Sequence, residues 1–145
     1  MELKRFLDAQ NQVYLKALSE IKNGRKTSHW MWYVFPQLRG LGSSEISDEY
    51  GISGVSEAIS YLAHPVLGKH LIEISEALLQ LDGFTAEEIF GYPDYLKLHS
   101  CMTLFAMVSD TDNIFNEVLK KYFDGIADER TVTAIRAKNI TKNIS

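Results

Sequence analysis

The sequence predicts an all-α fold in which a series of helices forms a single domain. Apolar residues recur every three or four positions along most of the chain, the repeat that gives a helix one apolar face. No segment alternates convincingly between apolar and polar residues, and residues 32–35 are the best strand candidate. With 145 residues, 46% hydrophobic and 23% charged, the chain has the size and composition of one globular domain. We therefore expect residues 1–145 to form one multi-helical globular domain.

The first predicted helix covers residues 3–21. Its apolar positions form one stripe, opposite a charged face. Asn23-Gly24 follows and supplies a left-handed helix stop. The stripe consists of Leu3, Phe6, Leu7, Val13, Tyr14, Ala17, Leu18 and Ile21.

Three short helices are expected in the next forty residues. Ser28 is the predicted N-cap of a helix over residues 29–34, which Pro36 ends. Residues 37–43 contain two glycines and read as a loop. Helices over residues 44–50 and 56–63 follow. The inward positions of the second are Ala58, Ile59 and Leu62.

A longer helix is predicted to start near Pro65, which suits a first helical turn, and to end before Asp82-Gly83. Thr85 to Glu88 has the form of a capping box and opens a brief helix that ends near Gly91. The apolar stripe of the longer helix is Leu67, His70, Leu71, Ile74, Ala77, Leu78 and Leu81.

The helix predicted over residues 95–108, with Asp94 as its cap, is apolar on nearly every side in its second half. We therefore expect it to run, largely buried, through the middle of the fold. Asp112 is the predicted cap of another amphipathic helix that Gly125 stops. A last helix is expected over residues 129–138, before a polar tail.

Composition limits the partners and the compartment. The net charge of −4 disfavours nucleic acid as a partner, because non-specific binding to it relies on a basic field. No apolar stretch approaches the roughly 18 residues of a membrane span. Charged residues interrupt the N-terminal segment, unlike a signal peptide, so a cytoplasmic protein is expected. The single cysteine, Cys101, lies in an apolar run and is interpreted as a buried, inert thiol.

The common catalytic and metal-binding motifs are absent. The chain has no glycine-rich phosphate loop, no paired-cysteine zinc spacing, no His-Glu-x-x-His and no Gly-x-Ser-x-Gly. The four histidines are spread along the chain, so their spacing predicts no metal site, and the residues identify no cofactor. His64 is interpreted as a turn residue and His70, on an apolar stripe, as packed core.

Residues 24–42 stand apart because they combine both tryptophans with flanking basic residues. A helix that starts at Ser28 would present unpaired backbone N–H groups and a positive dipole end, which attract anions. Aromatic faces beside an arginine suit a flat ring. The ligand-binding residues predicted here are Arg25, Ser28, Trp30, Trp32, Gln37 and Arg39.

A second polar stretch lies on the helix expected to be buried. Lys97 and Ser100 share one helix face, and polar groups on a buried helix must be hydrogen-bonded or line a cavity. We hypothesise that both stretches form one pocket for an anionic, nucleotide-like or phosphorylated small molecule. His29 would be its acid or base if the protein is an enzyme, which these residues do not decide.

Two alternatives stay open at this stage. The aromatic residues of 30–35 are also what a helical core contains, and the polar side chains can be satisfied internally. Alternatively, the protein is a non-enzymatic interaction module or a homodimer, in which residues 30–35 form an interface, because aromatic residues and arginine are enriched at interfaces.

Several segments along the chain form one recognisable pattern. They are Phe6-Leu7-Asp8-Ala9-Gln10, Ser28-His29-Trp30-Met31-Trp32, Phe35-Pro36-Gln37-Leu38-Arg39-Gly40-Leu41-Gly42, Tyr50-Gly51-Ile52, Tyr61-Leu62-Ala63-His64-Pro65-Val66-Leu67-Gly68, Leu96-Lys97-Leu98 and Met102-Thr103-Leu104-Phe105. Together these segments resemble the Domain of Unknown Function 1810 family. The chain has His99-Ser100-Cys101 where the family commonly has Arg-Ser-Ser. The resemblance implies a multi-helical bacterial fold and brings no established activity, substrate or catalytic residue.

Overall fold

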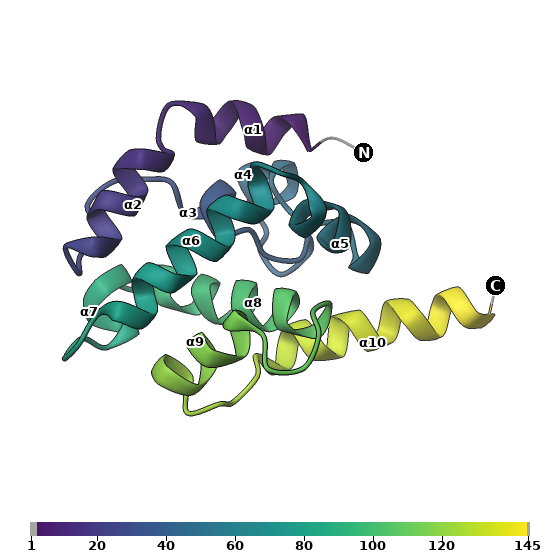
Figure 1. Cartoon of the computed structure of the whole chain (residues 1–145). Helices are drawn as coiled ribbons and strands as arrows, with labels where there is room; N and C mark the ends of the chain where they lie inside the picture. Colours follow the sequence, from purple (N-terminus) through teal and green to yellow (C-terminus); the bar gives the residue numbers. More distant parts are fainter. Residues whose placement is uncertain (1–2, 145) are drawn as a thin grey trace.

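Ten helices and no strand make up residues 3–144, which are the residues that the computed structural model describes, with side chains described as far as residue 138. The all-α prediction is confirmed (Figure 1). The strand candidate, residues 32–35, is wrong, because most of it is helical. The helices are α1 (Lys4–Asn11), α2 (Tyr14–Lys22), α3 (Met31–Val34), α4 (Glu45–Glu49), α5 (Val55–Ala63), α6 (Leu67–Gln80), α7 (Ala86–Phe90), α8 (Asp94–Met107), α9 (Ile114–Phe123) and α10 (Glu129–Ile144).

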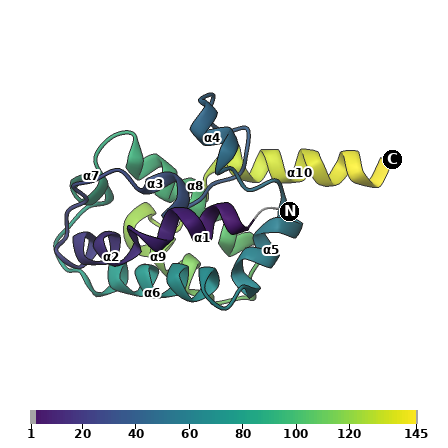
Figure 2. The same ribbon diagram turned by 90° about the horizontal axis from the view of Figure 1, so that it is seen from above.

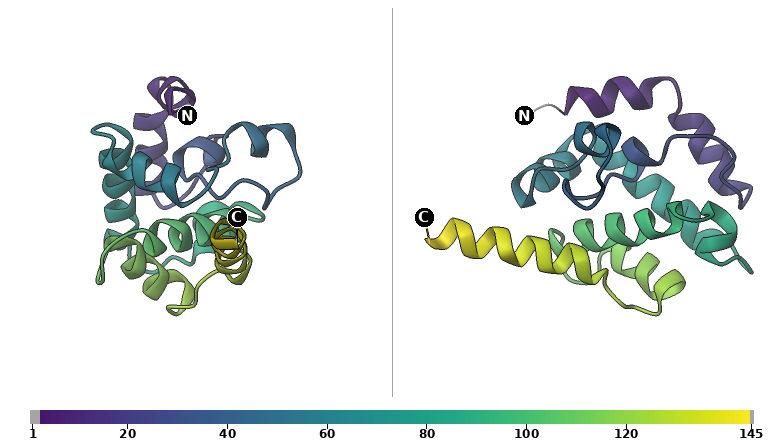
Figure 3. Two further views of the ribbon diagram at one scale, coloured as in Figure 1. Left: turned by 90° about the vertical axis from the view of Figure 1, so that its right-hand side faces the viewer. Right: turned by 180° about the vertical axis from the view of Figure 1, so that it is seen from behind.

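The helices pack around α8, which contacts α5, α7, α9 and α10 (Figure 1). On one side α6 packs against α2, α5 and α9, and α1 packs on α3. The short α4 projects from this body (Figure 2). The far end of α10 also leaves the body, so that the C-terminal end of the chain lies well away from α9 (Figure 3). No helix in the described part of the chain is both long and apolar enough to cross a membrane.

The predicted burial of the helix near residues 95–108 is confirmed. The side chain of Cys101 is fully buried, as expected, and burial raises the pKa of its thiol well above the usual value. The predicted cap is wrong: Pro93 is the N-cap, and Asp94, the first helical residue, uses its carboxylate to bind two lysines. The buried residues of α8 are Leu98, Ser100, Cys101, Met102, Thr103, Leu104 and Phe105.

The helix predicted over residues 3–21 is two helices. The chain turns at Gln12 and Val13, so that α1 packs on α3 whereas α2 packs on α6. Both halves keep the apolar stripe, and Phe6 and Tyr14 are buried, but against different neighbours. Hydrophobic spacing alone does not reveal such a break, because it only records which positions are buried.

The third helix starts later than predicted. Trp30, not Ser28, is the N-cap of α3, and no side chain caps this helix. The Ser28 hydroxyl instead donates to the Glu20 carboxylate on α2. With only four residues, α3 also has a small dipole, so the helix N-terminus predicted to attract an anion is not present in that form.

Other helix details are partly confirmed. The predicted capping box at Thr85 is present. Ser44, predicted as the first residue of a helix, is instead the N-cap of α4. Ile59, expected inside, is 50% exposed, because α5 turns Glu57 inward to the guanidinium of Arg5. This partly buried pair ties α1 to the start of α5.

Two predictions near the C-terminal end were wrong. Asn113, not Asp112, caps α9, and its side chain accepts from the backbone N–H of Asn116. Asp112 stands just before, with a left-handed backbone (φ of 64°). The last helix was predicted to end at residue 138 but continues to Ile144.

Candidate functional site

A buried carboxylate from α2, that of Glu20, organises the segment in which the sequence predicts a ligand site. Its oxygens accept from the backbone N–H groups of Thr27 (2.8 Å) and Ser28 (3.1 Å), the Ser28 hydroxyl and the indole N–H of Trp30 (2.9 Å). Burial by itself would raise the pKa of Glu20, but these hydrogen bonds lower it to about 2. The donors expected to bind an external anion therefore bind the carboxylate of Glu20 instead.

A small hollow lies between α3 and α8, where the two predicted stretches meet. Asp94 bridges the ammonium groups of Lys26 (2.8 Å) and Lys97 (3.0 Å), and Lys97 lies 3.9 Å from the centre of the Trp32 ring. Burial opposes ionisation of Asp94, but the two lysines lower the pKa of its carboxyl. His29, Trp30 and Met31 complete the lining of the hollow.

The hollow contains some of the predicted site residues and excludes others. His29, Trp30, Trp32 and Lys97 line it, whereas the other five predicted residues do not. Its volume of about 110 Å³ is well below the roughly 300–1,000 Å³ of small-molecule pockets. The residues outside it are Arg25, Ser28, Gln37, Arg39 and Ser100.

The excluded residues have other surroundings. Arg39 is exposed and donates from Nε to the carbonyl of Asp48 (3.0 Å). The carbonyl of Gln37, a buried residue, accepts from the N–H of Ile52. Arg25 is exposed at the surface. Both arginines that were predicted to bind the ligand therefore lie outside the hollow.

Ser100 belongs to the junction between α8 and α10. Its hydroxyl donates to a carboxylate oxygen of Asp128 (2.9 Å), which also accepts from the hydroxyl (2.5 Å) and backbone N–H (3.3 Å) of Thr131. The N–H of Asp128 in turn donates to the hydroxyl of Thr103 (2.8 Å). These contacts attach the start of α10 to α8.

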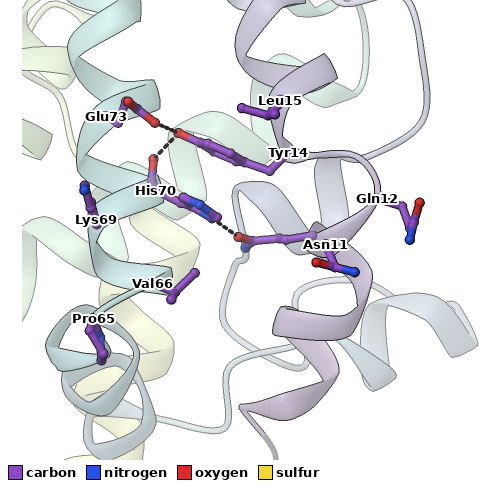
Figure 4. Close-up of a pocket in the computed structure, with 10 residues that line it drawn as sticks. Asn11, Gln12, Tyr14, Leu15, Pro65, Val66, Lys69, His70 and Glu73 are labelled. Atoms are coloured by element: carbon purple, nitrogen blue, oxygen red, sulfur yellow. Dashed lines mark hydrogen bonds between the residues drawn. The ribbon is translucent and has the colours of Figure 1, made fainter.

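A larger groove lies between the corner that joins α1 to α2 and the first turns of α6 (Figure 4). Its volume is about 590 Å³, within the range of small-molecule pockets. This groove was not predicted from the sequence. Its lining residues are Gln10, Asn11, Gln12, Tyr14, Leu15, Pro65, Val66, Lys69, His70 and Glu73.

Stacked rings form one wall of this groove. The ring of Tyr14 lies parallel to the imidazole of His70, with a centroid distance of 3.6 Å and an interplanar angle of 7°. The Tyr14 hydroxyl donates to Glu73 (2.6 Å) and lies 3.0 Å from the carbonyl oxygen of His70 (Figure 4). Burial and the neighbouring carboxylate raise the pKa of Tyr14, so its hydroxyl stays protonated.

The amide of Gln10 determines which nitrogen of His70 carries the proton. Its nitrogen donates to the carbonyl of Tyr33 (2.7 Å) and the hydroxyl of Tyr61 (2.9 Å). Because a carbonyl can only accept, this orientation of the amide is required, and its oxygen faces Nδ1 of His70 at 2.8 Å. Nδ1 is therefore the protonated nitrogen.

The other nitrogen of the His70 ring, Nε2, is an unoccupied acceptor. Burial lowers the pKa of His70, so the imidazole is neutral near pH 7 and Nε2 carries a lone pair. Nε2 has no hydrogen-bond partner among the described residues. Every buried side-chain nitrogen of these residues does have a partner, so Nε2 is not fully buried and reaches solvent. The interpretation of His70 as packed core is thus corrected to a partly buried residue at a groove.

One signal in the sequence could have indicated this site. Gln10 falls on the apolar stripe of the first predicted helix, four residues after Phe6, and is buried. A polar side chain in such a position must find hydrogen bonds inside the protein. The partner, His70, lies 60 residues away, and nothing in the spacing identifies it.

The described residues include no group of three or more histidine, cysteine, aspartate or glutamate side chains placed to hold a metal ion. The geometry therefore offers no candidate metal centre in that part of the chain.

Comparison with known proteins identifies the family. A protein-family model described as "Protein of unknown function (DUF1810)" matches residues 1–135. The chain belongs to the DUF1810 family. This DUF1810 protein is also similar to a solved structure, that of the conserved hypothetical protein Rv1873 from Mycobacterium tuberculosis, with 50% sequence identity and a TM-score of 0.91 over 93% of this chain and 96% of that chain. A comparison with curated proteins finds no match.

Proposed function

We propose that this DUF1810 protein binds a small molecule in the groove between α1–α2 and α6. The observation that carries the proposal is Nε2 of His70, an acceptor that reaches solvent and is held in place by Gln10 and Tyr14. Oriented polar groups of this kind set the position of a ligand in a pocket.

The rest of the lining suits a ligand of mixed polarity. Leu15 is 79% exposed and Val66 is 42% exposed, so the groove offers apolar side chains to cover. The amides of Asn11 and Gln12 can both donate and accept hydrogen bonds. A ring-bearing molecule with polar edges would use both features.

The hollow between α3 and α8 is a second candidate site, and it supports the anionic part of the ligand expected from the sequence. Two ammonium groups face one carboxylate there, which leaves an excess of one positive charge in a partly buried place. With about 110 Å³, the hollow has room for a phosphate- or carboxylate-sized group, not for a whole nucleotide.

A thermal-shift experiment separates the two sites. The wild type would be screened with nucleosides, nucleotides, sugar phosphates and inorganic phosphate. Stabilisation by a groove ligand should be lost in His70→Asn and kept in His29→Asn, a matched change of an exposed histidine at the other site. Stabilisation by phosphate at the hollow should show the reverse dependence, lost in Lys97→Met and kept in His70→Asn. Equal stabilisation of all variants would contradict both assignments.

An interaction surface on residues 30–35 receives less support. Trp30 and Phe35 are each 1% exposed and lie in the core, which leaves Trp32 and Tyr33 partly accessible. Sedimentation of Trp32→Ala tests the homodimer: the interface proposal requires a wild-type dimer that this variant weakens. A wild-type monomer would exclude it.

A further inference from the structure

We infer that the groove selects a ligand that donates an O–H or N–H hydrogen bond to Nε2 of His70, and that protonation of this imidazole abolishes the selection. The inference rests on the proposed function and specifies its ligand class. Its basis is the hydrogen-bond geometry around one histidine.

The tautomer of His70 is fixed by its neighbour Gln10. The Gln10 amide cannot turn over, because its nitrogen must face the carbonyl of Tyr33. Its oxygen then accepts from Nδ1 of His70, and Nε2 is left as an acceptor. A ligand that can only accept has no favourable contact with this nitrogen, whereas a hydroxyl or ring N–H has one.

The charge state of His70 depends on the groups around its ring. An amide oxygen is neutral, so Gln10 orients the ring without stabilising an imidazolium as a carboxylate would. The titratable groups that line the groove beside His70 are Lys69 and Glu73 on α6 and Tyr14 on α2. Glu73 favours the imidazolium and Lys69 opposes it. The hydroxyl of Tyr14 already contacts Glu73, so this carboxylate is engaged.

Acid reverses the hydrogen-bonding role of Nε2. When Nε2 takes a proton it becomes a donor, and a ligand hydroxyl that donated to it loses its partner. The preference for a donor ligand should therefore disappear with the same midpoint as the titration of His70 itself. A structural role for this histidine would produce no such coincidence.

The tautomer is measured first, in ¹⁵N-labelled protein without any ligand. Two-bond ¹H–¹⁵N spectra should show Nδ1 of His70 protonated and Nε2 unprotonated at neutral pH. In Gln10→Glu the carboxylate should raise the titration midpoint of His70. If that variant does not fold, the wild-type spectrum still decides: an Nε2–H tautomer or an imidazolium at neutral pH overturns the inference.

Phenol and anisole then form a matched pair of probes, because they share the ring and differ in the hydroxyl donor. Amide shifts around residues 66–73 should report binding of phenol about tenfold tighter than that of anisole, the value of one hydrogen bond. The difference should vanish below the titration midpoint of His70 and in His70→Asn.

The outcomes separate the inference from the proposed function. Equal binding of phenol and anisole above the midpoint would overturn the ligand class and leave groove binding intact. A phenol preference that persists in His70→Asn would also overturn it. No shift at the groove with either probe would remove the proposed function, and the ligand class with it.

Discussion

Two polar networks in this fold differ in whether all their hydrogen-bonding groups have partners. Around Glu20, one carboxylate accepts four hydrogen bonds from residues 27–30, and the network is closed. Around His70, the amide of Gln10 and the ring of Tyr14 hold the imidazole in place, but Nε2 is left without a partner in the described part of the chain. The first network stabilises the fold, whereas the second leaves a hydrogen-bond acceptor that a ligand can use.

The difference shows why the densest polar and aromatic segment of the sequence is not the best site. Residues 24–42 include Trp30 and Phe35 in the core, and their polar neighbours are largely bound to other parts of the same chain. The groove instead collects residues from α1, α2 and α6 that look ordinary in the sequence. The two regions differ mainly in whether an acceptor lacks a hydrogen-bond partner, and less in which residue types cluster there.

Removal of the closed network should have the largest effect. Glu20→Ala leaves two backbone N–H groups, a hydroxyl and an indole N–H without their acceptor, and should lower the free energy of unfolding by about 3–5 kcal/mol. Urea denaturation measures it. The control Glu76→Ala, on the exposed side of α6, should change stability by less than about 0.5 kcal/mol. Equal losses would contradict the structural role of Glu20.

Acid should weaken the same network. The pKa of Glu20 is lowered from 4.5 to about 2 in the folded protein, so its stabilisation is fully present above 4.5 and is lost as the pH falls through about 2. The gap in unfolding free energy between wild type and Glu20→Ala should therefore narrow by up to roughly 3 kcal/mol over this interval. Urea titrations at several pH values test this, and a constant gap would refute it.

The packing of α6, which carries His70, should be sensitive to one glycine. A Cβ on Gly68, in the first turn of α6, would lie 2.0 Å from the carbonyl oxygen of Leu62, and this backbone atom cannot swing aside. Gly68→Ala should cost about 2–3 kcal/mol and shift the amide signals of His70. The control is Gly54→Ala, where an added Cβ meets nothing within 4 Å. Two equally mild variants would contradict the close packing of α5 on α6.

Contacts in the hollow should contribute least to the free energy of unfolding. Lys97→Met removes one cation from Asp94 and from the Trp32 ring, while Lys26 stays paired. We expect a loss below about 1 kcal/mol, with a coupling of about 0.5–1 kcal/mol to Trp32→Leu in a double-mutant cycle. Zero coupling would show that the ammonium–ring contact adds no stability.

Local rules explain how much of the fold could be predicted. The capping box at Thr85 is a contact within four residues, and it was predicted correctly. Ile59 was misplaced because Glu57 turns inward to Arg5, a partner 52 residues away. Ser28 was misjudged for the same reason, since its partner is Glu20 on α2.

The sequence alone determined the all-α class, the burial of α8 and the membership of the DUF1810 family, because each depends on periodicity or on motifs that are local along the chain. Only the tertiary structure decided which polar groups are satisfied. A hydrogen bond between Gln10 and His70 spans 60 residues, and its energy depends on an orientation that no spacing encodes. This long-range contact is what makes His70 an acceptor at a groove and not a histidine of the core.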